Sequence, residues 1–361
     1  MLSFTYDMLP SRVIFGAGCL DKLAEEIERL GATRALVLST PEQREQGAEM
    51  VKRLGSRAVG LFDRAVMHVP IEIAEAARDE ARRSAADCCV AVGGGSTTGL
   101  AKAIALVSDL PILAIPTTYA GSEMTPIWGL TESGLKKTGR DPRVLPKTVL
   151  YDPSLTITMS AMLSATSGMN SIAHCVEALY AKDANPIISM MAEEGIRALA
   201  KSLPVVVKAP SNLEARSDAL YGAWLGGISL GAVGMALHHK LCHTLGGSFN
   251  LPHADTHTVV LPHAAAYNAL ATTEAMSRIA RALGAASAAT GLFDLAASLG
   301  APTSLEKIGM KASDVDRAAD IAVQNPYYNP RPITREGIRA LLQNAFEGRR
   351  PQAQASPAAV R

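Results

Sequence analysis

Short apolar runs alternate with longer amphipathic stretches over the first 150 residues or so, and this alternation constrains the fold more than any other feature of the chain. The apolar runs lie at 35–39, 58–63, 88–94 and 111–118. The stretches between them, such as IEIAEAARDEARRSAA, are long enough for helices. Because strands that alternate with helices form βαβ units, the pattern predicts a doubly wound, mostly parallel sheet of the nucleotide-binding type.

The strand pattern stops near residue 153, and long stretches rich in alanine and leucine follow, such as AMLSATSGMNSIAHCVEALYA. These stretches predict an all-helical second half. The sequence therefore predicts a dinucleotide-binding α/β domain over 1–153, a helical catalytic domain over 154–350 and a tail over 351–361. Because the tail is small, polar and interrupted by proline, we expect it to fray.

Composition narrows the classes of function. A chain of 361 residues with 48% hydrophobic residues can bury two cores. Since 35 lysines and arginines nearly balance 34 aspartates and glutamates, no overall charge favours nucleic acid or a membrane surface, and we expect a small-molecule partner. Five cysteines without a C-x-x-C pattern predict buried thiols in a reducing compartment. With no signal-like N-terminus and no apolar run of about 18 residues, we expect a cytoplasmic protein.

A glycine-rich turn follows the apolar run at 88–94. Glycines let backbone amides approach a pyrophosphate, and the helix expected next would aim its positive end at the same charge. A tight strand-to-helix turn without a ligand remains an alternative, because the pattern is not G-x-G-x-x-G. Hydroxyl residues after the next apolar run favour the ligand, since open α/β sheets bind ligands at the carboxyl ends of their strands. The turn and these hydroxyl residues form the predicted cofactor-binding set: Gly93, Gly94, Gly95, Ser96, Thr97, Thr117, Thr118 and Ser122.

Ser39 stands at the ribose-reading position, at the end of the run 35–39. The chain has no carboxylate there to favour a free 2′-hydroxyl over a 2′-phosphate. The sequence therefore predicts NADH or NADPH as cofactor without choosing between them.

Six of the eight histidines fall between positions 238 and 263. His239 and His243 are four residues apart, so their rings share one face of a helix. His253 follows a loop that can return it to that face, and His174 lies further upstream. We interpret these four as one functional site, because imidazoles serve metal binding or proton transfer near neutral pH. The remaining histidines of the segment are expected to cap or pack: His238, His257 and His263.

Four motifs resemble, in order and spacing, the iron-containing (group III) alcohol dehydrogenase superfamily. They are GGGS, PTT-x-AGSE, G-x-N-x-x-x-H-x-x-E-A-L-Y, and H-x-x-x-H followed by PH at 252–253. The resemblance runs from about residue 12 to 342. It implies the dehydroquinate synthase-like plan of an α/β nucleotide-binding domain and an all-α domain, an active site in the cleft between them, and a homodimer.

In metal-dependent members of that superfamily an aspartate and three histidines hold the ion. The matching positions are Asn170, His174, His239 and His253, and His243 matches an additional active-site histidine. Gly99 stands where another aspartate is usual. Loss of a carboxylate beside a divalent ion forfeits on the order of several kcal/mol of binding, so the resemblance and the charge argument together predict a site without metal.

Together with the segments PTTYAGSEMTPIWGLTE and KKTGRDPRVLPKTVLYDP, these two departures make the chain similar to the maleylacetate reductase branch of the superfamily. That similarity implies reduction of the carbon–carbon double bond of maleylacetate to 3-oxoadipate by NADH or NADPH, in the degradation of aromatic compounds. A cleft without its own anions suits a dicarboxylate substrate. We expect His243, assisted by His239 or His253, to donate to the developing enolate, and the assignment among the three stays open. Cationic candidates for the substrate carboxylates are Lys136, Lys137, Arg140, Arg143 and Lys240.

Three alternatives remain at this point. Glu177 could orient an imidazole or form a structural salt bridge. The enzyme could be a metal-dependent alcohol or aldehyde dehydrogenase that accepts an asparagine ligand. A dehydroquinate synthase-like lyase would share the two-domain plan, but the histidine spacing fits the dehydrogenases better.

Overall fold

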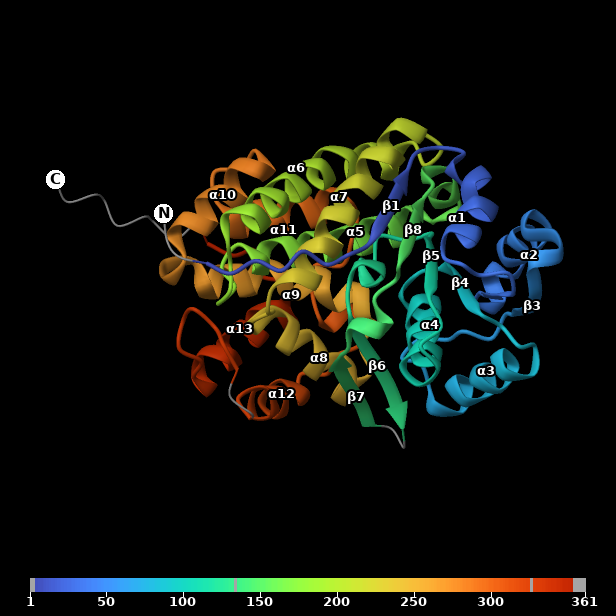
Figure 1. Cartoon of the computed structure of the whole chain (residues 1–361). Helices are drawn as coiled ribbons and strands as arrows, with labels where there is room; N and C mark the ends of the chain where they lie inside the picture. The colour runs from blue at the N-terminus through green and yellow to red at the C-terminus, as the bar shows by residue number, and fades with distance from the viewer. Residues whose placement is uncertain (1–3, 133–134, 325–326, 353–361) are drawn as a thin grey trace. The chain divides into compact units, whose positions relative to one another are not determined.

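The computed structural model describes residues 4–132, 135–324 and 327–352, which form two compact units (Figure 1). One unit is Met8–Met159, and the other is Ser160–Arg361 together with Met1–Asp7. Residues 353–361 of the predicted tail lie outside the described residues.

The first unit is built on a six-stranded, all-parallel sheet, which confirms the predicted α/β fold. From edge to edge, its strands are β1 (Arg12–Phe15), β8 (Thr148–Tyr151), β5 (Ile112–Pro116), β4 (Cys88–Gly93), β2 (Ala35–Leu38) and β3 (Ala58–Phe62). The four strands at the β3 side coincide with the predicted apolar runs. An antiparallel hairpin of β6 (Ile127–Glu132) and β7 (Leu135–Arg140) adds a second, small sheet.

Alternate residues of the central strands pack under helices on opposite faces of the sheet. Cys88 packs on the face covered by α1 (Leu23–Arg29) and α2 (Arg44–Leu54). Its neighbour Cys89 packs on the face covered by α3 (Ile71–Arg83) and α4 (Gly95–Ser108). Because both faces are covered, the strands read as continuous apolar runs rather than as alternating ones. All five cysteines are buried and free, as the sequence predicts.

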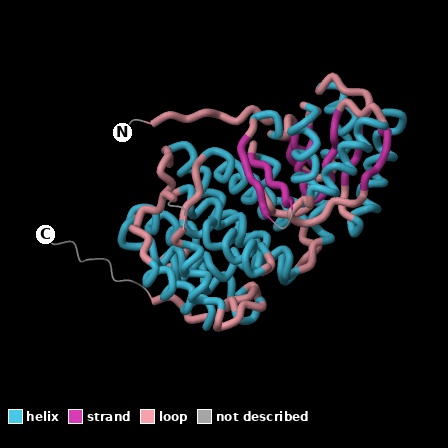
Figure 2. The backbone as a smooth tube through the Cα atoms, turned by 90° about the horizontal axis from the view of Figure 1, so that it is seen from below, coloured by secondary structure: helices cyan, strands magenta, loops and turns pink. Residues whose placement is uncertain are grey.

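The second unit is helical in its described residues, which confirms the all-α half of the prediction; Figure 2 shows the strands in magenta and the helices in cyan. Gly226 on α7 (Leu213–Ala232) marks a close approach to α5 (Ala161–Ala178), since a Cβ there would lie 2.3 Å from Ser171 Oγ. The helices are α5 (Ala161–Ala178), α6 (Pro186–Lys208), α7 (Leu213–Ala232), α8 (Leu237–Phe249), α9 (His253–Asn268), α10 (Thr273–Leu283), α11 (Ala288–Ser298), α12 (Asp314–Ala322) and α13 (Arg335–Glu347).

Within the described residues, no single helix is both long and apolar enough to cross a membrane. The helices α7 and α8, bent by 94° at the break between them, reach that length and composition only as a pair.

Candidate active site

The glycine turn closes against side chains from two other segments of the α/β unit. Gly93 has φ 150°, and a Cβ there would lie 2.4 Å from Thr97 Oγ1 and 2.7 Å from Gln43 Oε1. Gln43 donates from Nε2 to Thr117 Oγ1 at 2.6 Å. The turn therefore requires glycine, and the sequence pattern did not predict the part played by Gln43.

The N-terminus of α4 lies beside the end of β5. A Cβ on Gly94 would lie 2.7 Å from Thr118 Oγ1, so the backbone here packs directly against a hydroxyl. Gly95 is exposed and Ser96 is half-buried at the start of this 14-residue helix. Free backbone N–H groups, a positive helix end and a hydroxyl suit the pyrophosphate of a dinucleotide, so the residues present fit the predicted cofactor.

Ser39 lies at the carboxyl end of β2, as expected from the sequence, but inside the unit. Its side chain is fully buried, and a Cβ on Gly47 of α2 would lie 3.0 Å from its Oγ. The Oγ has no hydrogen-bond partner. Its role in reading the ribose stays a prediction.

A buried lysine, which the sequence pattern did not single out, holds the segment that carries Ser122. The Lys102 Nζ on α4 donates to the carbonyl oxygens of Ser122, Thr125 and Ile127 at 2.7–2.8 Å. Burial lowers the pKa of Lys102 to about 7, and the Glu123 carboxylate opposes that shift. The ammonium thus ties the hydroxyl segment to the helix that begins at the glycine turn.

Lys102→Met is expected to lower the free energy of unfolding by about 3 kcal/mol, because the carbonyl groups of Ser122, Thr125 and Ile127 lose the charged donor that joins them. Chemical denaturation measures the change. The matched control Lys147→Met replaces an exposed lysine of the same unit, and its effect should stay within about 0.5 kcal/mol. Equal stability of the two variants would contradict the role given to Lys102.

Most cations proposed for the substrate carboxylates already have partners. Arg143 pairs with Asp141 at 2.8 Å and with Asp109 at 3.2 Å, and these carboxylates raise its pKa. Lys137 pairs with Glu132. In the helical unit, the Lys240 Nζ lies 5.4 Å from the ring centre of Tyr327. Because Arg143 is neutralised by two carboxylates, it is a weak candidate for a substrate contact.

The helices α5, α8 and α9 bring most of the predicted histidines together. The rings of His174 and His239 stack with centres 5.2 Å apart, and those of His239 and His243 lie 6.3 Å apart. His253, the first residue of α9, lies 4.4 Å from the ring of His257. Asn170 precedes His174 by one turn of α5 and is 5% exposed. His243 and His253 are exposed, so they are open to a substrate.

Glu177 lies where it can orient an imidazole, the first of the two roles that the sequence left as alternatives, and it also accepts backbone N–H groups. Its fully buried carboxylate accepts a hydrogen bond from Nδ1 of His239 at 2.7 Å. Nε2 is then the nitrogen of that ring without a hydrogen-bond partner. The same carboxylate accepts the backbone N–H groups of Ala236 and His238, at 2.9 and 2.7 Å. A side chain of α5 therefore caps the N-terminus of α8 and orients one of its imidazoles.

Burial makes the interior of this cluster neutral. It lowers the pKa values of His174, His238 and His257 well below the usual histidine value, and neighbouring imidazoles add to the effect. These rings therefore carry no charge at neutral pH. These three rings present hydrogen-bonding nitrogens without a positive charge.

The positions that match the superfamily's metal ligands do not fit a divalent iron ion well. Asn170 Oδ1, His174 Nδ1 and His239 Nε2 are buried without hydrogen-bond partners, so they could take a ligand. Three imidazoles and an amide nevertheless supply no anion to a hard cation. In the part of the chain that the structure describes, the possible ligand atoms found within 4.8 Å of one another belong to a different group: His238, Cys242 and His257.

Family models match both parts of the chain. Residues 10–153 match the model described as iron-containing alcohol dehydrogenase, and residues 164–346 match that of the C-terminal part of the Fe-containing alcohol dehydrogenase family. The chain belongs to the iron-containing alcohol dehydrogenase family. Its membership confirms the resemblance seen in the sequence motifs, and the chain is an oxidoreductase.

Within this family, several relatives at high identity are maleylacetate reductases. The chain is 61% identical to that of Burkholderia cepacia over 351 residues, covering 97% of this chain and 100% of the relative. Identity to that of Sphingobium indicum is 60%, covering 97% and 99%. The solved maleylacetate reductase of Agrobacterium tumefaciens is 55% identical with a TM-score of 0.95, covering 97% of this chain and 100% of that one.

Proposed function

We propose that this chain reduces the carbon–carbon double bond of maleylacetate to give 3-oxoadipate, with NADH or NADPH as hydride source and without a metal ion. The reductase activity is supported by relatives that are 51–61% identical over nearly the whole chain. The observation that carries the metal-free part is the buried amide of Asn170, which stands beside His174 where a metal-binding carboxylate would be expected.

An amide at position 170 suits a doubly negative substrate. A carboxylate at position 170 would repel the two carboxylates of maleylacetate, whereas the amide does not. Because the double bond is conjugated to the ketone, reduction can proceed through an enolate, and a hydrogen-bond donor can stabilise the oxygen that becomes negative. That chemistry needs no Lewis acid if an imidazole stands at this oxygen.

The residues of the chain have separate roles in cofactor binding and in proton donation. The glycine turn, Thr117, Thr118 and Ser122 would hold the cofactor, which supplies the hydride when bound. His243 donates to the ketone oxygen, and the anchored ring of His239 or the exposed ring of His253 assists it and delivers the proton that completes reduction. The homodimer and the cytoplasmic location expected from the sequence stay proposals.

Metal-stripped protein mixed with maleylacetate and NADH is expected to consume NADH at the rate of untreated protein, and added iron or zinc should not raise that rate. Absorbance of the reduced nicotinamide follows the reaction. Activity that disappears on chelation and returns with iron would instead favour a metal-dependent dehydrogenase, for which the unpartnered atoms of Asn170 and His174 would be ligands. Turnover without net NADH consumption would point to a lyase.

A further inference from the structure

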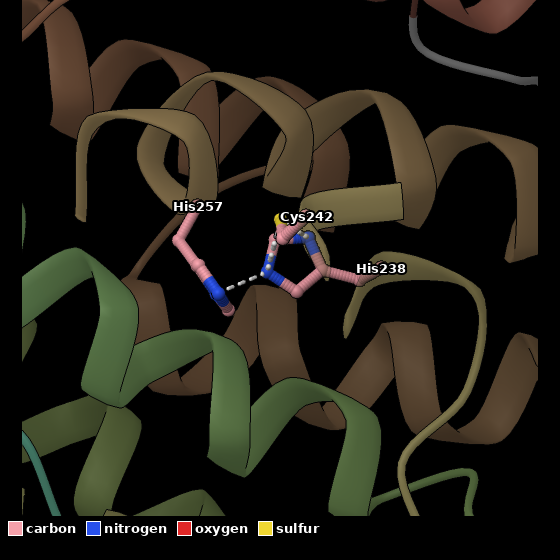
Figure 3. A group of neighbouring side chains, drawn as sticks. All are labelled: His238, Cys242 and His257. Carbon is pink, nitrogen blue, oxygen red and sulfur yellow. Dashed lines mark hydrogen bonds between the residues drawn. The ribbon is translucent and has the colours of Figure 1, made fainter. Parts of the chain in front are cut away.

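Three buried side chains next to the predicted catalytic histidines form a hydrogen-bonded chain. Nε2 of His238 lies 2.9 Å from Nδ1 of His257, and Sγ of Cys242 lies 3.7 Å from the same Nε2 and 4.0 Å from Nδ1 of His238 (Figure 3). None of the three residues is more than 1% exposed. The sequence predicted only packing or capping for the two histidines, yet the structure joins them into one network.

The ring of His257 connects this network to the active site. Its centre lies 4.4 Å from that of His253 and 5.0 Å from that of His239. Its Nε2 is buried and has no hydrogen-bond partner. A buried nitrogen without a hydrogen bond lowers the stability of the folded protein by about 1–3 kcal/mol. A role for this nitrogen in the enzyme would explain why a histidine stands at position 257 despite that loss.

The bond between the two rings gives the network a direction. A hydrogen bond at 2.9 Å between two ring nitrogens has one donor and one acceptor, so only one of the two facing nitrogens carries a proton. If Nε2 of His238 donates to Nδ1 of His257, the proton of His257 is on its own Nε2. Cys242 remains a thiol and can donate to Nδ1 of His238, which completes a chain of three donors in one direction.

We propose that His257 is a positioning residue, which donates from Nε2 to the ring of His253 and so orients the other nitrogen of His253 toward the substrate. The 4.4 Å separation of the two ring centres brings their nitrogens within hydrogen-bonding reach when His253 rotates. His238 holds the ring of His257 in place and sets its tautomer. The proposal rests on the proposed function only for the choice of substrate.

His257→Asn keeps a group near the Nδ1 position for His238 but removes Nε2. We expect kcat to fall about 10–100-fold, while KM for the nicotinamide cofactor stays unchanged. The matched control is His263→Asn, on the same helix. His263 is also buried with an unpartnered Nε2, but its ring lies beside Phe293 and is not part of the hydrogen-bonded network of His238, Cys242 and His257. This variant should keep wild-type kinetics.

A second pair of variants tests the link to His238. His238→Phe fills the space without a hydrogen bond and should reproduce the loss of kcat, whereas His238→Gln can still bond to Nδ1 of His257 and should recover most of it. Loss in both variants, or in neither, would overturn the proposal. So would equal losses in His257→Asn and His263→Asn.

Two further outcomes separate this proposal from others. A wild-type protein that fails to reduce maleylacetate would refute the proposed function, but the same variants can then be compared on whichever aldehyde or alcohol it does turn over. Cadmium added to the wild-type protein should give no thiolate absorption band. A band that Cys242→Ser abolishes would show that the three side chains form a metal site and would overturn the proposed chain.

Discussion

Replacing His243 with alanine is expected to lower kcat for maleylacetate reduction by about 10²–10⁴-fold. The exposed imidazole, 6.3 Å from the ring of His239, is the proposed donor to the enolate oxygen, and a positioned acid of this kind contributes about that factor. Steady-state consumption of NADH at saturating maleylacetate measures the effect.

Two comparisons make the His243 result specific. His243→Gln keeps an N–H donor and should recover part of the rate. Retention of near wild-type turnover by His243→Ala, with maleylacetate still bound, would remove His243 from the mechanism.

Glu177→Ala is expected to lower the free energy of unfolding by about 4 kcal/mol and to reduce activity as well. The buried N–H groups of Ala236 and His238 would lose their acceptor, and Nδ1 of His239 would lose the partner that fixes its ring. Chemical denaturation measures the first effect, and kcat of the protein that remains folded measures the second.

Glu214→Ala is the matched control for Glu177, because Glu214 is an exposed carboxylate in the first turn of α7. It should change the stability by less than about 1 kcal/mol. If Glu177→Ala were as stable and as active as this control, the cap would be unimportant.

The strands most readily predicted from the sequence are those buried on both faces. β4 and β5 appear as uninterrupted apolar runs because helices cover both of their sides. β1 (RVIF) and β8 (TVLY) each begin with a polar residue, unlike the equally short β2 (ALVL), so neither gives an uninterrupted apolar run. β7 reads LKKTGR, and its charges give no strand pattern, although it forms one arm of a hairpin.

In the candidate site, too, the sequence predicted only relations that are local along the chain. Helical spacing predicted that His239 and His243 share a face, because that relation is local in sequence. Gln43 contacts Thr117 across 74 positions, and the carboxylate of Glu177 reaches the ring of His239 across 62. Such contacts depend on how the elements pack, and no local pattern indicates them.

Because Cys88 and Cys89 point to opposite faces of the sheet, their reactivity can report the local opening of each helical layer. Burial raises the pKa of Cys89 to about 12, and it raises that of Cys88 as well, so neither thiol reacts with an alkylating reagent while its helical layer is closed. Labelling of Cys88 would signal that α1 and α2 have loosened, and labelling of Cys89 that α3 and α4 have. Mass spectrometry that distinguishes labelled Cys88 from labelled Cys89 would therefore reveal which helical layer opens first.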